Sequence, residues 1–141
     1  MVKGILRTVL ACAFMVVGTA AALAQAYNPE EVAKLRAFLN QPSAVAGKTN
    51  GQTLNAAFDE NNPATYNVDW SSDAIDKRVS RISWGYRTEK LNGSFVISSF
   101  TKVAEINLNS NSLSNVAIDN CPLLKYLYLE NVGIQQFNVT T

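Results

Sequence analysis

The stretch INLNSNSL, residues 106–113, places an asparagine inside a run of alternating apolar residues. Its apolar positions are Ile106, Leu108 and Leu113, and Asn111 lies between them in the order L-x-L-x-x-N-x-L. A chain that turns a corner after a short strand leaves backbone N–H and C=O groups without partners, and a buried asparagine side chain can satisfy them. We therefore predict that Asn111 is buried at a bend, and that the pattern around it recurs.

The apolar pattern recurs further along the chain. Adding 21 to the residue numbers of six apolar positions between Val103 and Ile118 gives six apolar positions between Leu124 and Val139, a coincidence expected roughly once in sixty when half of all residues are apolar. Adding 24 to the numbers of apolar positions in the segment 79–84 gives the same pattern, which indicates a short insertion in the first unit. This period lies in the range of leucine-rich repeats. Asn111 maps onto Val132, so the last bend is expected to differ.

The segment 1–26 has the composition of a secretory signal peptide. Lys3 and Arg7 precede an almost wholly apolar stretch, and the closing ALAQA allows cleavage after Ala24 or Ala26. The apolar stretch, about 16 residues, is shorter than the roughly 20 residues of a membrane-spanning helix. A lipoprotein is a less favoured alternative, because the box ending at Cys12 has little apolar sequence ahead of it. We expect a secreted, periplasmic or cell-surface protein with no stable membrane span after signal removal.

Side chains suited to catalysis are scarce in this chain. It has no histidine, which excludes Ser-His-Asp and Cys-His nucleophilic sites and the H-E-x-x-H zinc motif. Removal of Lys3 and Arg7 with the leader takes the 12 basic residues to 10, against 11 acidic residues, so there is no basic surplus to attract nucleic acid. A glycosidase needs only two carboxylates, and the acids that could meet in space are Asp69, Asp73, Asp76, Glu105 and Glu130. We interpret them as solvated, and expect no enzyme, cofactor or metal site.

Residues 27–78 are predicted to form an N-terminal helical cap and an irregular connection. Asn28 can cap a helix that begins at Pro29 and whose apolar stripe ends before Pro42. The polar segment after Pro42 indicates a loop with one short helix near residues 54–58.

Residues 79–141 are predicted to hold repeats of about 21–24 residues, with strands near 80–84, 105–109 and 126–130. The motifs V-x-x-I-x-W, LNGSF, INLNSNSL and DNCPLLKYLYL resemble the N-terminal cap and first repeats of secreted bacterial leucine-rich-repeat proteins. This resemblance implies an α/β solenoid, in which a capping helix is followed by about three leucine-rich-repeat coils with a short parallel β-sheet on the concave face.

In such a repeat, strand residues that alternate with the inward leucines face solvent on the concave side. Tyr126 and Tyr128 are the most informative of them, since tyrosine joins a broad apolar ring to a hydroxyl group. Packing against a neighbouring coil is the alternative explanation for both rings. The predicted ligand-binding positions are Arg81, Ser83, Glu105, Asn107, Asn109, Tyr126, Tyr128 and Glu130.

The leading hypothesis is a recognition module that binds a protein or glycan through this face. Two alternatives are the capping end of a longer adhesin or scaffold and, less favoured, a carboxylate-based enzyme acting on glycans. The last repeat, ending in FNVTT, lacks the polar cap that usually closes a solenoid. It is therefore expected either to continue in a longer protein or to pair end to end with a second copy.

Overall fold

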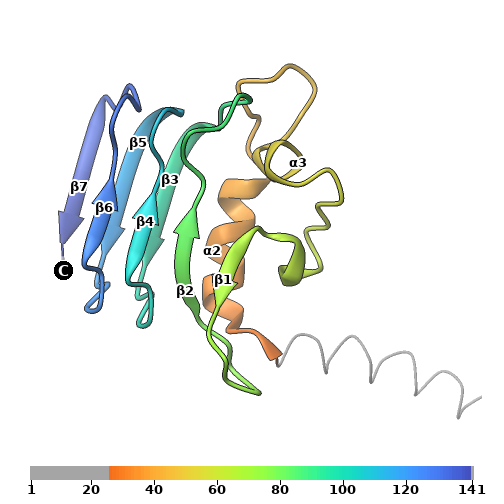
Figure 1. The fold of residues 1–141 in the computed structure, drawn as a ribbon, viewed down its shortest axis with the longest axis vertical. Coiled ribbons are helices and arrows are strands. Elements are labelled where there is room, and N and C mark those ends of the chain that lie inside the picture. Colours follow the sequence, from red (N-terminus) through yellow and green to blue (C-terminus); the bar gives the residue numbers. More distant parts are fainter. Residues whose placement is uncertain (1–25, 141) are drawn as a thin grey trace, which may run out of the picture.

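The computed structural model describes residues 26–140. The predicted leader, up to residue 25, lies outside the described residues. Within the described part of the chain, no helix is long and apolar enough to cross a membrane. The helices lie at one end of the fold and the strands follow one another away from them (Figure 1).

The described chain contains two short helices, one 3-10 turn and seven strands. In chain order these are α2 (Pro29–Leu39), α3 (Asn50–Leu54), η1 (Pro63–Thr65), β1 (Val68–Trp70), β2 (Val79–Ser83), β3 (Asn92–Ser98), β4 (Glu105–Asn107), β5 (Ser112–Asp119), β6 (Tyr126–Tyr128) and β7 (Gln136–Thr140).

Local capping explains where both helices begin. The Asn28 side chain accepts a hydrogen bond from the backbone N–H of Glu31 at 3.0 Å, which confirms the predicted start of α2. Helix α3 begins earlier than predicted, because the Thr49 hydroxyl caps the backbone N–H of Gln52 while the Gln52 side chain accepts from the N–H of Thr49. This reciprocal pair fixes the helix at residues 50–54.

The predicted repeat spacing is the spacing between paired strand positions. Ile106 pairs with Leu127 across β4 and β6, a difference of 21 in residue number, and Ile82 pairs with Ile106 across β2 and β4, a difference of 24. Both of these strand pairs are parallel. The periodicity therefore predicted the correct register for these three strands.

The predicted α/β solenoid with one concave sheet is wrong. The strands form two sheets, a mixed four-stranded sheet in the order β1-β2-β4-β6 and a parallel three-stranded sheet in the order β3-β5-β7. These sheets lie one behind the other rather than curling into a single concave surface (Figure 1). The reason is that the segments between the predicted strands are strands themselves: β5 alternates buried and exposed residues and carries the β-branched pair Val116 and Ile118.

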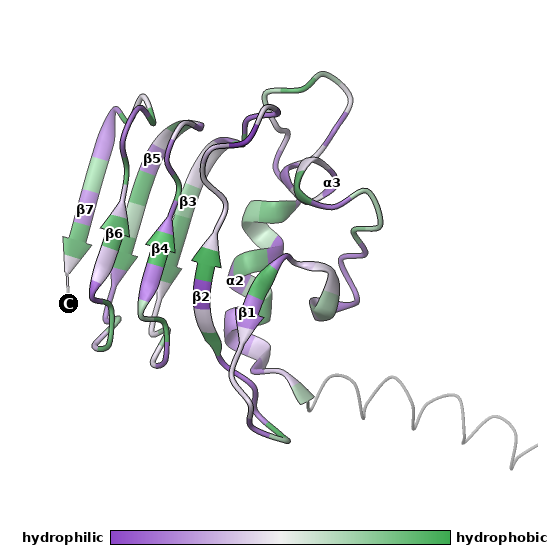
Figure 2. Ribbon diagram, viewed as in Figure 1, coloured by the Kyte–Doolittle hydropathy of each residue, from purple (hydrophilic) through white to green (hydrophobic). Residues whose placement is uncertain are grey.

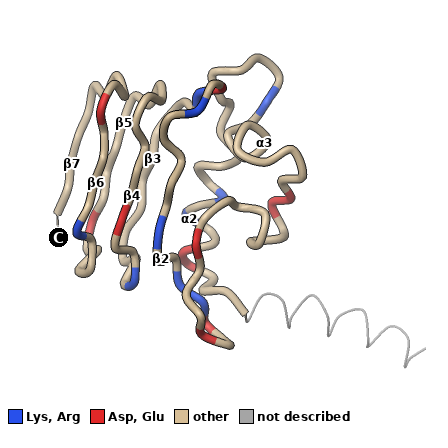
Figure 3. Tube along the Cα trace, in the orientation of Figure 1, with Lys and Arg blue, Asp and Glu red and all other residues tan. Residues whose placement is uncertain are grey.

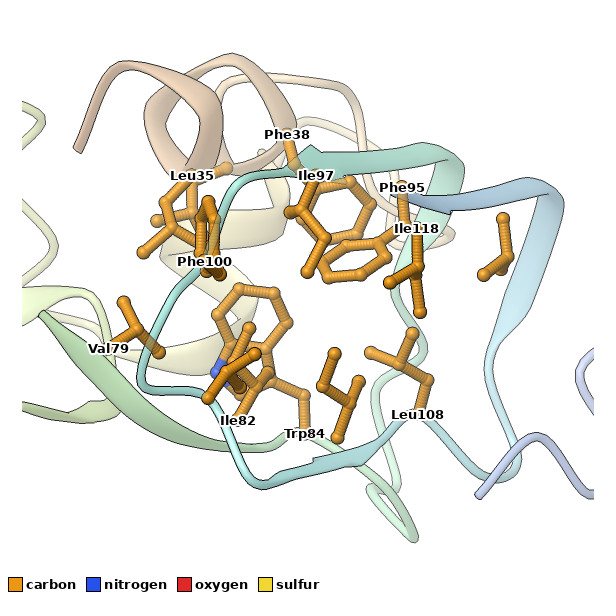
Figure 4. Packing of buried hydrophobic residues seen from close by; sticks show 14 of the residues in the cluster. Leu35, Phe38, Val79, Ile82, Trp84, Phe95, Ile97, Phe100, Leu108 and Ile118 are labelled. Carbon is orange, nitrogen blue, oxygen red and sulfur yellow. The ribbon is translucent and has the colours of Figure 1, made fainter. Parts of the chain in front are cut away.

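The hydrophobic core fills the space between the two sheets and extends to α2 (Figure 4). Figure 2 shows the corresponding alternation of hydrophobic and hydrophilic positions along the strands. Trp84 is fully buried and joins the layers: its ring stacks on Phe38 of α2 at 5.6 Å and meets Phe95 of β3 edge-on at 6.0 Å. Its Nε1 donates to the carbonyl of Asn67 at 2.7 Å, so the indole N–H is satisfied.

Asn111 occupies the predicted buried position at a bend, with 3% of its surface exposed. Its Oδ1 accepts from the backbone N–H of Leu91 at 2.8 Å, and its Nδ2 donates to the carbonyls of Trp84 and Leu108 at 3.0 and 2.9 Å. One side chain thus satisfies backbone groups from three segments of the chain, which confirms the prediction made from INLNSNSL.

Glu31 is a buried acid that connects α2 to β2. Its Oε2 accepts from the backbone N–H of Val79 at 2.7 Å, and its Oε1 lies 3.5 Å from Nη1 of Arg78. Only 1% of the residue is exposed. Burial raises the pKa of the Glu31 carboxyl, although the Val79 bond and Arg78 act in the opposite direction.

This raised pKa predicts a measurable pH dependence. The folded protein holds the Glu31 proton more tightly than the unfolded chain does, so ionisation lowers the free energy of unfolding as pH rises from about 4.3, the value for an unfolded glutamate. Glu31→Gln keeps an acceptor for Val79 but cannot ionise. We expect urea unfolding to show that the variant loses less stability than the native protein between about pH 4 and pH 7. Parallel curves for the two proteins would contradict this assignment.

Candidate functional site

The outer side of the four-stranded sheet aligns six of the predicted binding residues in two rows. Arg81, Glu105 and Tyr126 are paired across β2, β4 and β6. The second row is Ser83, Asn107 and Tyr128. The repeat shifts of 24 and 21 in residue number imply these alignments, and we refer to the six residues as the tyrosine face.

Tyr126 and Tyr128 remain accessible in the described structure, with 55% and 43% of their surfaces exposed. They are two residues apart on β6 and therefore project from the same side of the strand. Their ring planes are parallel within 7°, with centroids 6.4 Å apart. The neighbouring strand β4 does not cover either ring, so both tyrosines expose aromatic surface to solvent.

The charges of the tyrosine face neutralise each other. Nε and Nη2 of Arg81 both lie within hydrogen-bond distance of Oε1 of Glu105, at 3.1 and 3.0 Å. The basic position on β2 and the acidic position on β4 lie on neighbouring strands (Figure 3). Arg81 and Glu105 are partly exposed, so their ion pair contributes little to stability. Because Arg81 and Glu105 have opposite charges, the tyrosine face carries no net charge beside the two neutral tyrosine rings.

Asn107 has a fixed orientation at the centre of the second row. Its Oδ1 accepts from the backbone N–H of Asn109 at 3.1 Å. The same oxygen lies 2.1 Å from the position that a Cβ atom would take at Gly85, so the absence of a side chain at Gly85 makes room for the amide. Because the carbonyl is engaged, the Nδ2 of Asn107 is the end of the amide that can donate to a partner.

Asn109 is not the solvent-facing residue that the sequence predicted. It is 3% exposed, its Nδ2 donates to the Tyr86 hydroxyl at 2.7 Å, and its Oδ1 accepts from the backbone N–H of Glu130 at 2.6 Å. Strand β4 ends at Asn107, so the alternation no longer determines which way Asn109 points. Asn109 is therefore a structural residue: its side chain links the segment that follows β2, at Tyr86, to the segment that follows β6, at Glu130.

Tyr86 is an exposed aromatic residue beside the tyrosine face that the sequence analysis missed. Its backbone adopts a left-handed conformation, with φ of 55°, and 66% of its surface is exposed. Its hydroxyl also lies 3.3 Å from Oε2 of Glu130, the last of the predicted binding residues. Tyr86 follows the end of β2, where no alternation remains to indicate its side. The sequence signal that could have drawn attention to Tyr86 was its position directly after Trp84 and Gly85.

The acids considered for catalysis are engaged separately. Asp73 bonds to Lys102 and Ser71, and the Lys102 bond is the main cause of its lowered pKa. Asp76 bonds to Asn28 and Arg78, and its pKa is also lowered.

Glu105 and Glu130 lie at different positions relative to the four-stranded sheet: Glu105 begins β4, and Glu130 follows β6. Glu105 aligns with Tyr126 on β6, whereas Glu130 comes four residues after Tyr126, beyond the end of that strand. The two carboxylates have different partners: Oε1 of Glu105 bonds to Arg81, and Oε2 of Glu130 lies 3.3 Å from the Tyr86 hydroxyl. Among the residues that the structure describes, no group of three or more Cys, Asp or Glu side chains could hold a metal ion.

Comparisons of the chain with protein-family models, with curated proteins and with solved structures find no significant match. The leucine-rich-repeat resemblance therefore stays an interpretation of the sequence motifs.

Proposed function

We propose that this chain is an exported recognition module that binds a protein or glycan partner through the tyrosine face. The observation that carries the proposal is the pair of exposed, parallel rings of Tyr126 and Tyr128 beside a row of polar side chains. A tyrosine ring offers a large contact area while losing little conformational entropy, and neighbouring polar groups give direction to the contact.

The charged leader at the start of the chain supports export as part of this proposal. Lys3 and Arg7 before an apolar run, followed by small residues at Ala24 and Ala26, match the organisation of a cleaved signal. After export, the partner of the tyrosine face would be an extracellular or periplasmic molecule.

Self-association is a second proposal about partners. Strands β6 and β7 are the edges of their sheets in the described chain. Phe137 of β7 is 58% exposed, whereas its paired residue Val116 on β5 is fully buried. An end-to-end pair of molecules would cover Phe137, so light scattering should accompany any binding measurement.

Replacing both Tyr126 and Tyr128 by alanine is expected to weaken partner binding at least about thirtyfold, or about 2 kcal/mol, because both aromatic contacts are removed. The measurement is an isothermal titration with a partner found on a glycan or protein array. Val96→Ala is the control, since it truncates an exposed apolar side chain on β3 of the other sheet. Equal affinities of the native protein and the double variant would refute the proposed site, provided that their circular dichroism spectra agree.

A further inference from the structure

We propose that the ligand of the tyrosine face is a neutral polysaccharide, held with its sugar rings against Tyr126 and Tyr128. This inference rests on the proposed function, since it names the chemical class of ligand for the same site. Three observations carry it: the position of the tyrosines in the sheet, the charge balance of the face, and the orientation of Asn107.

The tyrosines lie on β6, which is an edge strand of its sheet in the described chain. Protein interfaces usually place their aromatic anchors near the centre of a contact patch, surrounded by residues that exclude water. Here the rings are at one margin and remain about half exposed. A narrow ligand that runs along the strand can reach both rings, because they follow each other along β6 as a stacked pair with centroids 6.4 Å apart. A polysaccharide chain has this shape.

The charge balance of the tyrosine face favours an uncharged ligand. The guanidinium of Arg81 is already bonded to Glu105 at 3.0 Å, so an acidic polymer would have to break this pair or approach a carboxylate. The face of a tyrosine ring carries partial negative charge. The polarised C–H bonds on the flat side of a neutral sugar ring complement it through weak C–H contacts.

Asn107 supplies a directed hydrogen-bond donor next to Tyr128. The two residues are paired across β4 and β6. The Asn107 Oδ1 is engaged by the N–H of Asn109 at 3.1 Å, which leaves Nδ2 as the end of the amide that can donate to a ligand. A sugar ring stacked on Tyr128 would place its hydroxyl oxygens within reach of this amide. Ser83, the next residue in the row, carries a hydroxyl that can both donate and accept.

The test is affinity electrophoresis of the purified protein in gels containing a neutral polysaccharide, with laminarin, xyloglucan and soluble glycol chitin as probes. Polygalacturonate and dextran sulfate are the charged comparisons. We expect retardation by at least one neutral polymer, and the same retardation at low and high salt, because no ion pair with the ligand is involved. Tyr126→Ala and Tyr128→Ala should each weaken this binding at least about tenfold.

Conservative variants separate the proposed contacts from a general loss of structure. Tyr126→Phe keeps the ring and should retain binding within about threefold, while Asn107→Ala removes the donor and should weaken binding by about fivefold or more. Val96→Ala, which truncates an exposed apolar side chain on β3 of the other sheet, should bind like the native protein. Binding affinities that follow these expectations, near-native for Tyr126→Phe and weaker for Asn107→Ala, would support ring stacking together with a directed hydrogen bond.

Several results would overturn the inference. Binding only to the charged polymers, with loss at high salt, would show that the ligand is anionic. Binding of a protein through Tyr126 and Tyr128 without binding of any neutral polymer would reject the glycan and leave the proposed function intact. Neutral-polymer binding that both tyrosine variants retain would reject the tyrosine face as the site, and failure to bind any glycan or protein would reject both proposals.

Discussion

Replacing Asn111 by leucine is expected to lower the free energy of unfolding by about 3 to 5 kcal/mol, because three buried backbone groups lose their partner at once. The N–H of Leu91 and the carbonyls of Trp84 and Leu108 all bond to the Asn111 amide. Leucine has a similar shape and offers no polar atom. Each buried backbone group that loses its hydrogen-bond partner costs about 1 to 3 kcal/mol, and partial relaxation of the structure reduces the total for the three groups.

Urea unfolding monitored by tryptophan fluorescence gives this difference, since Trp84 lies beside the altered site. Asn138→Ala is the matched control: Asn138 is exposed on β7, and its replacement should change the free energy of unfolding by less than about 0.5 kcal/mol. Similar losses for the two variants would mean that Asn111 does not hold the bend together.

Leu108→Ala is expected to cost about 2 to 5 kcal/mol, the usual range for emptying a buried leucine site. Leu108 is fully buried between the two sheets, where it lies in the same core as Trp84 and Ile118 (Figure 4). The tight packing on both sides limits how far the neighbouring side chains can move into the space left by the leucine.

Leu123→Ala makes the same chemical change at a site that is 51% exposed, and should cost less than about 0.5 kcal/mol. Denaturant midpoints for both variants, compared with the native protein, test the difference. Equal losses at the two leucines would contradict the observed burial. Leu127→Ala, which the repeat pattern placed with Leu108, should cost less than Leu108→Ala, since Leu127 is only partly buried on the edge strand β6.

The register of one sheet could be predicted from the sequence, because parallel strands pair residues at a constant shift. The shift of 21 in residue number placed Glu105 opposite Tyr126 and Asn107 opposite Tyr128, as the structure has them. The second sheet could not be predicted in this way. The segment 112–119 repeats at the same shift as β4 does, so periodicity alone did not distinguish a strand from the back of a leucine-rich repeat. The β-branched residues in β5 were the signal for a strand.

The rest of the candidate site depends on contacts beyond the strands. Asn109 turns inward because Tyr86 and the backbone of Glu130 come within reach of its amide, and both are far from it in sequence. The strand β1 has only three residues, Val68–Trp70, which is too few to establish an alternation. In each of these cases the decisive information is the proximity of segments that only the folded chain brings together.

The most direct test of the proposed binding surface is amide chemical-shift mapping of the nitrogen-15-labelled protein during titration with the polysaccharide or protein that binds. We predict that the largest changes lie on β4 and β6, at Asn107, Tyr126 and Tyr128. The paired residues Val96 and Ala117 of the other sheet should be unchanged. Changes centred on Val96 and Ala117, with none at the two tyrosines, would contradict the central claim that the tyrosine face is the binding site.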